Sequence, residues 1–211
     1  MFRLENVKYK DVLHIETLAF PAHKITCLVG PSGGGKTTLL KLLNKILTPD
    51  EGAVFYKENN LETIDSVMHR RDVVLLSQTP FIFPGTIRDN LLKGLRYQGK
   101  HREDATLLEA LKRVALTQSL DDDADTLSGG EKQRLALARI MVLDAQCILL
   151  DEPSSALDDE TEMRIVDDVV AYVRAHKKTL IMVTHAKSIA KKVGAHTCTI
   201  EAGRLKGCET A

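Results

Sequence analysis

The sequence predicts an α/β fold built on a parallel sheet that is buried on both faces. Two observations predict it. Short, continuous apolar runs recur along the chain and are typical of strands buried on both faces, at Ile25–Val29, Val73–Leu76, 147–150 and Thr179–Val183. Longer segments with helical spacing separate them, at 105–115, 130–144 and Asp159–Ala175. Strands that alternate with helices favour a parallel sheet.

Two segments depart from this pattern. Residues 4–20 alternate apolar and polar side chains, which predicts half-buried antiparallel strands. Residues 80–126 have only helical spacing and supply no core strand. We therefore expect a single domain over 1–211, with an α/β core formed by 1–78 and 127–211, an antiparallel β subdomain, and an inserted α-helical subdomain at 79–126.

The composition argues against nucleic-acid binding and against a metal site formed by cysteines. Lys plus Arg and Asp plus Glu both number 29, so the formal net charge is zero. A chain without a basic excess is not expected to bind nucleic acid. The four cysteines, at 27, 147, 198 and 208, have no metal-ligand spacing. We expect them to remain free thiols without a structural disulfide, in a reducing, intracellular compartment.

The chain shows no sign of a membrane-targeting segment of its own. Its start, MFRLENVKYKD, lacks the apolar run of a secretory signal. No stretch approaches the roughly 18 apolar residues that a membrane-spanning helix needs. Any function at a membrane would then depend on a partner.

A glycine-rich loop follows the first buried strand and fits the pattern G-x-x-x-x-G-K-[ST]. Glycines let backbone N–H groups surround a phosphate, and the helix that follows directs its positive end at the same anion. Lys36 can reach the β- and γ-phosphates, and Thr37 offers a hydroxyl to Mg²⁺. The loop predicts ATP binding by Gly30, Pro31, Ser32, Gly33, Gly34, Gly35, Lys36, Thr37 and Thr38.

Two carboxylates, Asp151 and Glu152, follow the buried strand at 147–150. α/β folds bind ligands at this end of a strand. Adjacent strand residues point in opposite directions, so the two side chains are expected to have separate tasks. We predict that Asp151 holds Mg²⁺ and that Glu152 orients and deprotonates the attacking water.

The segment Leu-Ser-Gly-Gly-Glu-Lys-Gln-Arg at 127–134 narrows the choice among phosphate-loop proteins. It resembles the signature motif of the ABC (ATP-binding cassette) family. Physically, Ser128, Gly129 and Gly130 open a helix and so offer a second anion site. The resemblance implies that this site caps the ATP of a partner subunit. An ordinary helix N-cap with a capping-box glutamate is the simpler alternative.

Further segments are similar to the remaining motifs of the family, in the same order. The resemblance makes Gln78 the Q-loop glutamine that meets Mg²⁺, residues 155–158 the D-loop, and His185 the switch histidine at the γ-phosphate. Tyr9 stands where the family places an aromatic ring against adenine, although a strand tyrosine is also common in packing. The other histidines match no motif, and we expect them to be solvated: His14, His23, His69, His101, His176 and His196.

The resemblance covers the chain from about 4 to 205 and implies a RecA-like P-loop NTPase core. It implies an ATPase in which Lys36, Gln78, Glu152 and His185 act on ATP, with Mg²⁺ as cofactor. A second copy would pair head to tail in an ATP-dependent dimer. An integral membrane permease would dock on the helical subdomain near 79–90, at the cytoplasmic face of the membrane.

The chain looks most like small, stand-alone bacterial cassettes, including those grouped with metal-ion exporters. Two alternatives belong to other classes. One is a soluble ABC ATPase not coupled to transport, such as the iron–sulfur assembly type. The other is a nucleotide-binding module without hydrolysis, which the presence of both Glu152 and His185 disfavours.

Overall fold

The structure is a computed structural model, and it describes residues 1–153, 159–184, 187–193 and 195–210. The chain divides into two compact units, which are described separately. The first unit comprises 1–75, 146–152 and 173–211, and the second comprises 76–145 and 153–172.

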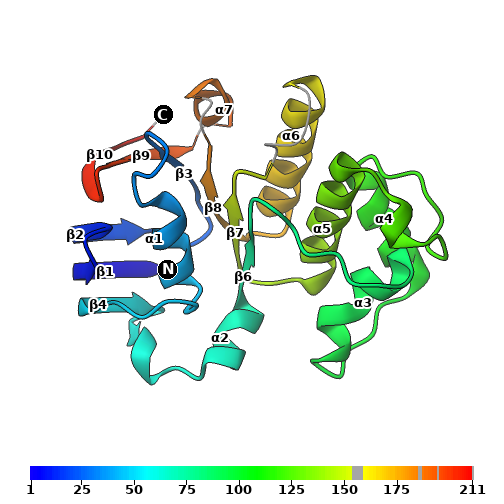
Figure 1. Ribbon diagram of the computed structural model, residues 1–211, viewed down its shortest axis with the longest axis horizontal. Helices are drawn as coiled ribbons and strands as arrows, with labels where there is room; N and C mark the ends of the chain where they lie inside the picture. The colour runs from blue at the N-terminus through cyan, green and yellow to red at the C-terminus, as the bar shows by residue number, and fades with distance from the viewer. Residues whose placement is uncertain (154–158, 185–186, 194, 211) are drawn as a thin grey trace. The chain divides into compact units, whose positions relative to one another are not determined.

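An antiparallel sheet contains the N-terminal strands of the first unit, in the order β2-β1-β4-β5 (Figure 1). Its strands are β1 (Phe2–Tyr9), β2 (Leu13–Phe20), β4 (Glu51–Tyr56) and β5 (Asn59–Asn60). Leu13, Ile15, Leu18 and Phe20 of β2 are buried on one face, as the alternation in the sequence predicts.

A second sheet has the order β10-β9-β3-β8-β7-β6. Its strands are β3 (Ile25–Val29), β6 (Val73–Leu76), β7 (Cys147–Asp151), β8 (Thr179–Val183), β9 (His196–Glu201) and β10 (Arg204–Thr210). β3 pairs in parallel with β8 and β9, and β7 pairs in parallel with β8. Every residue of β3, β7 and β8 is buried, which explains their continuous apolar sequences.

Short helices complete the first unit: α1 (Lys36–Leu43), α2 (Ser66–Asp72) and α7 (Lys187–Lys192). α1 begins at the phosphate loop and buries four leucines, which join a core cluster with side chains of both sheets. A 3₁₀ turn, Leu61–Thr63, precedes α2.

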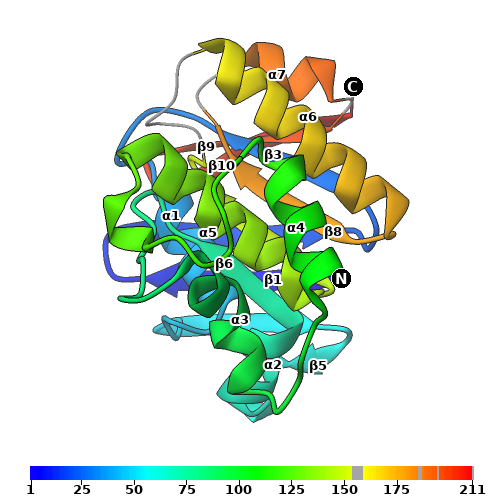
Figure 2. The same cartoon turned by 90° about the vertical axis from the view of Figure 1, so that its right-hand side faces the viewer.

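The second unit contains α3 (Ile87–Arg96), α4 (Asp104–Arg113), a 3₁₀ turn at Ala124–Thr126, and α5 (Gly129–Leu143). α5 packs against both α3 and α4 (Figure 2). α6 (Asp159–Ala175) contributes its first part, to Tyr172, to this unit. No described residue between 80 and 126 belongs to a strand, apart from one isolated bridge between Thr86 and Asp123. The predicted fold class, an α/β core with antiparallel and helical parts, is confirmed.

The expectation that all four cysteines are free is wrong. Cys198 and Cys208 form a disulfide, while Cys27 and Cys147 are free and buried. The two bridged residues stand directly opposite each other in the antiparallel pair β9–β10. The apolar-run criterion did not reveal this hairpin because its strands are mixed in polarity. The bridge also removes the cysteine-based argument for a reducing compartment.

The expectation that His69 is solvated is also wrong. Its side chain is 1% exposed and lies edge-on to the rings of Phe2 and Tyr56. Its Nε2 donates a hydrogen bond to the carbonyl of Leu43 at 2.7 Å. Burial lowers the pKa of His69, so the imidazole is neutral in the core.

Candidate functional site

The phosphate loop connects the last residue of β3 to the first turn of α1. Gly35, just before the helix, has a φ of 97°, a left-handed conformation that suits glycine. The Lys36 side chain is 5% exposed, and its Nζ donates to the carbonyls of Gly30 and Pro31, each at 2.9 Å. The ammonium group thus lies in the curl of the loop.

Close backbone packing explains two of the loop glycines. A Cβ on Gly30 would lie 1.9 Å from the carbonyl oxygen of Ile200, and one on Gly34 would lie 2.9 Å from that of Pro31. Atoms at such separations overlap, so any side chain would displace the backbone. The loop therefore presents bare backbone N–H groups, which is what phosphate binding requires.

The turn between β9 and β10 is hydrogen-bonded to the phosphate loop. Gly203 N donates to Gly34 O at 3.1 Å, and Gly203 O accepts from His14 N at 2.7 Å. A single glycine thereby joins the loop to the start of β2. The sequence analysis missed this residue, although a glycine between two alternating segments is a hairpin signal that could have indicated it.

Asp151 ends β7 and is 5% exposed. Thr37 Oγ1 donates a hydrogen bond to Asp151 Oδ1 at 3.1 Å. Burial raises the pKa of Asp151, and the Thr37 hydrogen bond partly opposes that rise. The hydroxyl and the carboxylate are thus adjacent, and both are ligands that Mg²⁺ accepts.

Glu152 follows Asp151 with a φ of 47°. This left-handed conformation is uncommon for a residue with a side chain. Glu152 is partly exposed, whereas Asp151 is buried. The two neighbouring carboxylates therefore lie in different environments, as the proposed division of their tasks requires.

Ser128 forms the N-cap of α5 in the second unit. Its Oγ donates to Glu131 Oε2 at 2.6 Å, and its backbone N–H donates to the same oxygen at 2.8 Å. These bonds lower the pKa of Glu131. Gln118 Nε2 donates to the other oxygen, Oε1. The capping box that the sequence offered as the simpler alternative is thus present, and Ser128 must exchange its partner to donate to a phosphate.

The remaining predicted residues are distributed as follows. Gln78 is exposed after β6, in the second unit. Gly129 is exposed at the start of α5, where a Cβ would meet nothing within 4 Å. Tyr9 is half-buried at the end of β1, with Lys10 Nζ 5.4 Å from its ring centre. His185 and residues 155–158 lie outside the described residues.

The first unit thus brings together the loop 30–38, Asp151 and Glu152. This group fits a nucleoside triphosphate with Mg²⁺, because it combines an anion cradle, a buried ammonium and a hydroxyl–carboxylate pair. Among the described residues, no three His, Cys, Asp or Glu side chains gather as an independent metal site. No described helix is both long and apolar enough to cross a bilayer.

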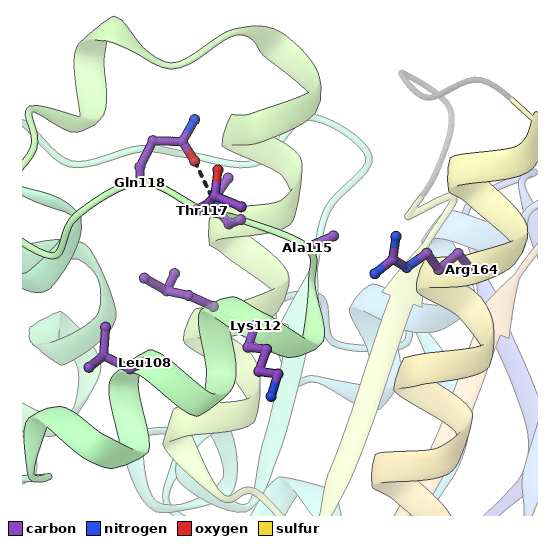
Figure 3. A pocket seen from close by; sticks show the side chains of 8 residues that line it. Leu108, Lys112, Ala115, Thr117, Gln118 and Arg164 are labelled. Carbon is purple, nitrogen blue, oxygen red and sulfur yellow. Dashed lines mark hydrogen bonds between the residues drawn. The ribbon is translucent and has the colours of Figure 1, made fainter.

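The second unit contains a separate pocket of about 480 Å³ (Figure 3). It is lined by Leu108, Leu111, Lys112, Ala115, Leu116, Thr117, Gln118 and Arg164. None of the predicted site residues lines it. Gln118 lines this pocket and also donates to Glu131, in the capping box at the start of α5.

The chain is similar to known ATP-binding proteins. The family model described as "ABC transporter" matches residues 13–155. The transport/processing ATP-binding protein ComA of Streptococcus pneumoniae is 38% identical over 203 residues, covering 90% of this chain but 28% of ComA. The chain therefore spans little more than a quarter of that relative. The probable iron export ATP-binding protein FetA of Escherichia coli is 32% identical over 192 residues, covering 89% of this chain and 85% of FetA.

A solved structure is similar over the full chain. It is the dimeric structure of a post-hydrolysis state of the ATP-binding cassette MJ0796 bound to ADP and Pi. The TM-score is 0.88 at 26% sequence identity, covering 100% of this chain and 98% of that chain.

Proposed function

The chain belongs to the ABC transporter family, and we propose that it binds and hydrolyses ATP to drive transport through separate membrane subunits. One observation carries the proposal. The phosphate loop, with Lys36 in its curl, lies beside the Thr37–Asp151 pair in a single unit. An anion cradle next to a carboxylate suits Mg-ATP rather than a simple anion.

In the proposed reaction, water attacks the γ-phosphate and ADP leaves. Backbone N–H groups of residues 30–38 hold the phosphates, and Lys36 moves from its carbonyl partners to the β- and γ-oxygens. Glu152 orients the water and accepts its proton, and His185 contacts the γ-phosphate. Thr37, Asp151 and Gln78 would hold Mg²⁺, which when bound neutralises phosphate charge.

The dimer is proposed to bring Ser128, Gly129 and Gly130 of one copy to the ATP on the loop of the other. Two features support it. One unit already contains a complete phosphate loop, so a second anion site suggests a second nucleotide. The similar MJ0796 cassette is described as a dimer with ADP and Pi. Ser128 would donate to the phosphate after leaving Glu131.

A membrane permease is proposed to dock at 79–90. Phe81 is 67% exposed and lies edge-on to Phe83, with ring centres 4.9 Å apart. Asn90, fully buried, holds this segment by bonds to the backbone of Phe83. Arg139 Nη2 donates to Phe81 O at 2.8 Å. An exposed aromatic side chain on a fixed backbone can pack against the apolar face of a partner helix.

For the cargo we propose a metal ion, and for the location the cytoplasmic face of the membrane. The similarity to FetA, which is named for iron export, supports the cargo. The competing function is a soluble ABC ATPase of the iron–sulfur assembly type. The exposed Phe81 supports the transporter, because its segment is held by Asn90 and Arg139 and offers an apolar contact for a membrane partner.

The test is to purify the tagged chain from its native membranes in mild detergent and identify what accompanies it. We expect a stoichiometric polytopic membrane protein. Phe81→Glu should lose this partner and keep ATP binding. Tyr97→Glu is the matched control, since Tyr97 is 73% exposed in the same unit but lies outside 79–90. Recovery of only a soluble assembly would refute the proposed transport function but not the proposed ATPase activity.

A further inference from the structure

A basic pocket of about 360 Å³ lies in the first unit, away from the phosphate loop. Its lining is His23, Lys24, Ile25, Val173, Arg174, Lys177, Lys178 and His196. Four of these side chains are lysine or arginine and two are histidine. No Asp or Glu is among the described residues that line it. The chain as a whole has zero formal net charge, so positive charge is concentrated at this pocket.

The pocket lies at the amino-terminal ends of the parallel strands, whereas the phosphate loop lies at the carboxyl end of β3. Ile25 begins β3, His196 begins β9, and Lys178 directly precedes β8. The phosphate loop instead follows Val29, at the other end of β3. A strand of this length spans about 15 Å. A ligand in the basic pocket is therefore distinct from the nucleotide on the loop.

The pocket is held in shape by contacts between its own walls. His23 N donates to Thr179 Oγ1 at 2.9 Å, and His23 Nδ1 donates to the carbonyl of Lys177. These two bonds join the turn before β3 to the turn before β8. Arg174 Nη2 donates to Val193 O at 2.5 Å, which orients the guanidinium. A site that is already formed loses less conformational entropy when it binds a ligand.

The chemistry of the lining selects an anion. Ile25 and Val173 are buried and supply an apolar base, while Lys24, Arg174 and Lys177 are exposed around it. A carbonyl can only accept a hydrogen bond, so His23 carries its proton on Nδ1. Like charges in one pocket repel each other, and a bound anion relieves that repulsion.

We propose that this pocket binds a phosphate-bearing anion, either a small phosphorylated molecule or a phospholipid head group. Its volume lies within the range of small-ligand sites, roughly 300–1,000 Å³. Lysine, arginine and histidine together provide several charge-assisted donors to phosphate oxygens. The pocket gives the chain an anion-binding function that is separate from the phosphate loop and from Ser128, and that does not depend on the proposed ATPase activity.

Inorganic pyrophosphate is the first probe, titrated by calorimetry into the full-length Lys36→Ala chain, in which the phosphate loop is disabled. Wild-type chain saturated with ADP serves as the second background, in case Lys36→Ala folds poorly. We expect saturable binding that Lys24→Gln/Lys177→Gln weakens by about tenfold or more, since it removes two charged donors.

The control variant is Lys100→Gln/Lys206→Gln, which removes the same charge from exposed positions outside the pocket. It should leave pyrophosphate binding within about twofold, because exposed charges that do not line the pocket are screened by salt. Equal weakening by both variants would overturn the proposal and indicate a diffuse charge effect. Absence of saturable binding in both backgrounds would overturn it as well.

Vesicles distinguish the two sources of the anion. The chain is sedimented with vesicles of phosphatidylcholine alone and of phosphatidylcholine mixed with phosphatidylglycerol. Sedimentation that requires phosphatidylglycerol, and that Lys24→Gln/Lys177→Gln abolishes, assigns a lipid head group. Pyrophosphate binding without such sedimentation assigns a free phosphorylated anion.

Discussion

Thr37 and Asp151 are 114 residues apart in the sequence, and a single hydrogen bond brings their side chains together. The sequence predicted both as Mg²⁺ ligands, Thr37 from the phosphate-loop pattern and Asp151 from its place at the end of a buried strand. It could not predict that burial raises the pKa of Asp151, since that depends on the packing around β7. The sequence thus indicated which residues lie together in the first unit, but not their electrostatics.

Asp151→Asn should stabilise the Mg²⁺-free chain and abolish Mg²⁺-dependent ATP hydrolysis. The raised pKa means that the folded state retains the Asp151 proton to higher pH than the unfolded state. The charged carboxylate therefore destabilises the fold at neutral pH. An amide removes the charge and still accepts the Thr37 hydroxyl. Urea unfolding at neutral pH should show a higher free energy of unfolding for Asp151→Asn than for the wild type, and a lower one would contradict this description of the site.

His69 makes the stability of the chain depend on pH. Its pKa in the folded state is lowered from 6.5, so below that pH the unfolded state binds the proton more readily. The contribution of neutral His69 to the free energy of unfolding is present in full above about pH 6.5 and is lost as the pH falls. Urea unfolding should show this loss in the wild type and a smaller one in His69→Leu. The exposed His101→Leu is the control, and an unchanged slope in His69→Leu would refute the assignment.

At the scale of elements, the phosphate loop depends on a hairpin that lies outside its motif. Gly203, in the turn between β9 and β10, donates to Gly34 O and accepts from His14 N. The order of the elements was predictable from alternating apolar runs and helical segments. β9 and β10 were not, because their mixed polarity resembles a surface segment, and their pairing depends on contacts with β3 and on the Cys198–Cys208 bridge.

Gly203→Ala should weaken both stability and nucleotide binding. Its φ is +73°, and a Cβ there would lie 2.3 Å from the carbonyl oxygen of Val12, so the turn must shift and disturb the hydrogen bond from Gly203 N to Gly34 O. We expect a loss of more than about 1 kcal/mol in stability and a clearly higher Kd for a fluorescent ATP analogue.

Gly99→Ala is the matched control for Gly203→Ala. Gly99 has a φ of +64°, and a Cβ there would meet nothing within 4 Å. It therefore shares the backbone strain and lacks the collision. Equal nucleotide affinity in the two variants would show that the hairpin does not support the loop.

At the scale of the whole molecule, the chain contains one complete phosphate loop and a second helix-start anion site at Ser128. The structure shows Ser128 bonded to Glu131, which is the resting arrangement of a capped helix. The sequence offered two roles for Ser128, a capping box and an anion site, and the structure shows the contacts of the capping box. The identity of the family was predictable from the order of the motifs, whereas the basic pocket at the amino-terminal ends of the parallel strands was not, because its residues come from three separate segments.

The most direct test of the ATPase dimer uses Glu152→Gln. The amide keeps the shape of the side chain but cannot accept a proton from water, so ATP should bind without being cleaved. We would measure ATP hydrolysis and, by sedimentation equilibrium with and without ATP, the mass of the particle. We predict that Glu152→Gln hydrolyses ATP at least about a hundredfold more slowly than the wild type and accumulates as a dimer only with ATP. Hydrolysis at the wild-type rate, or a monomer at saturating ATP, would contradict it.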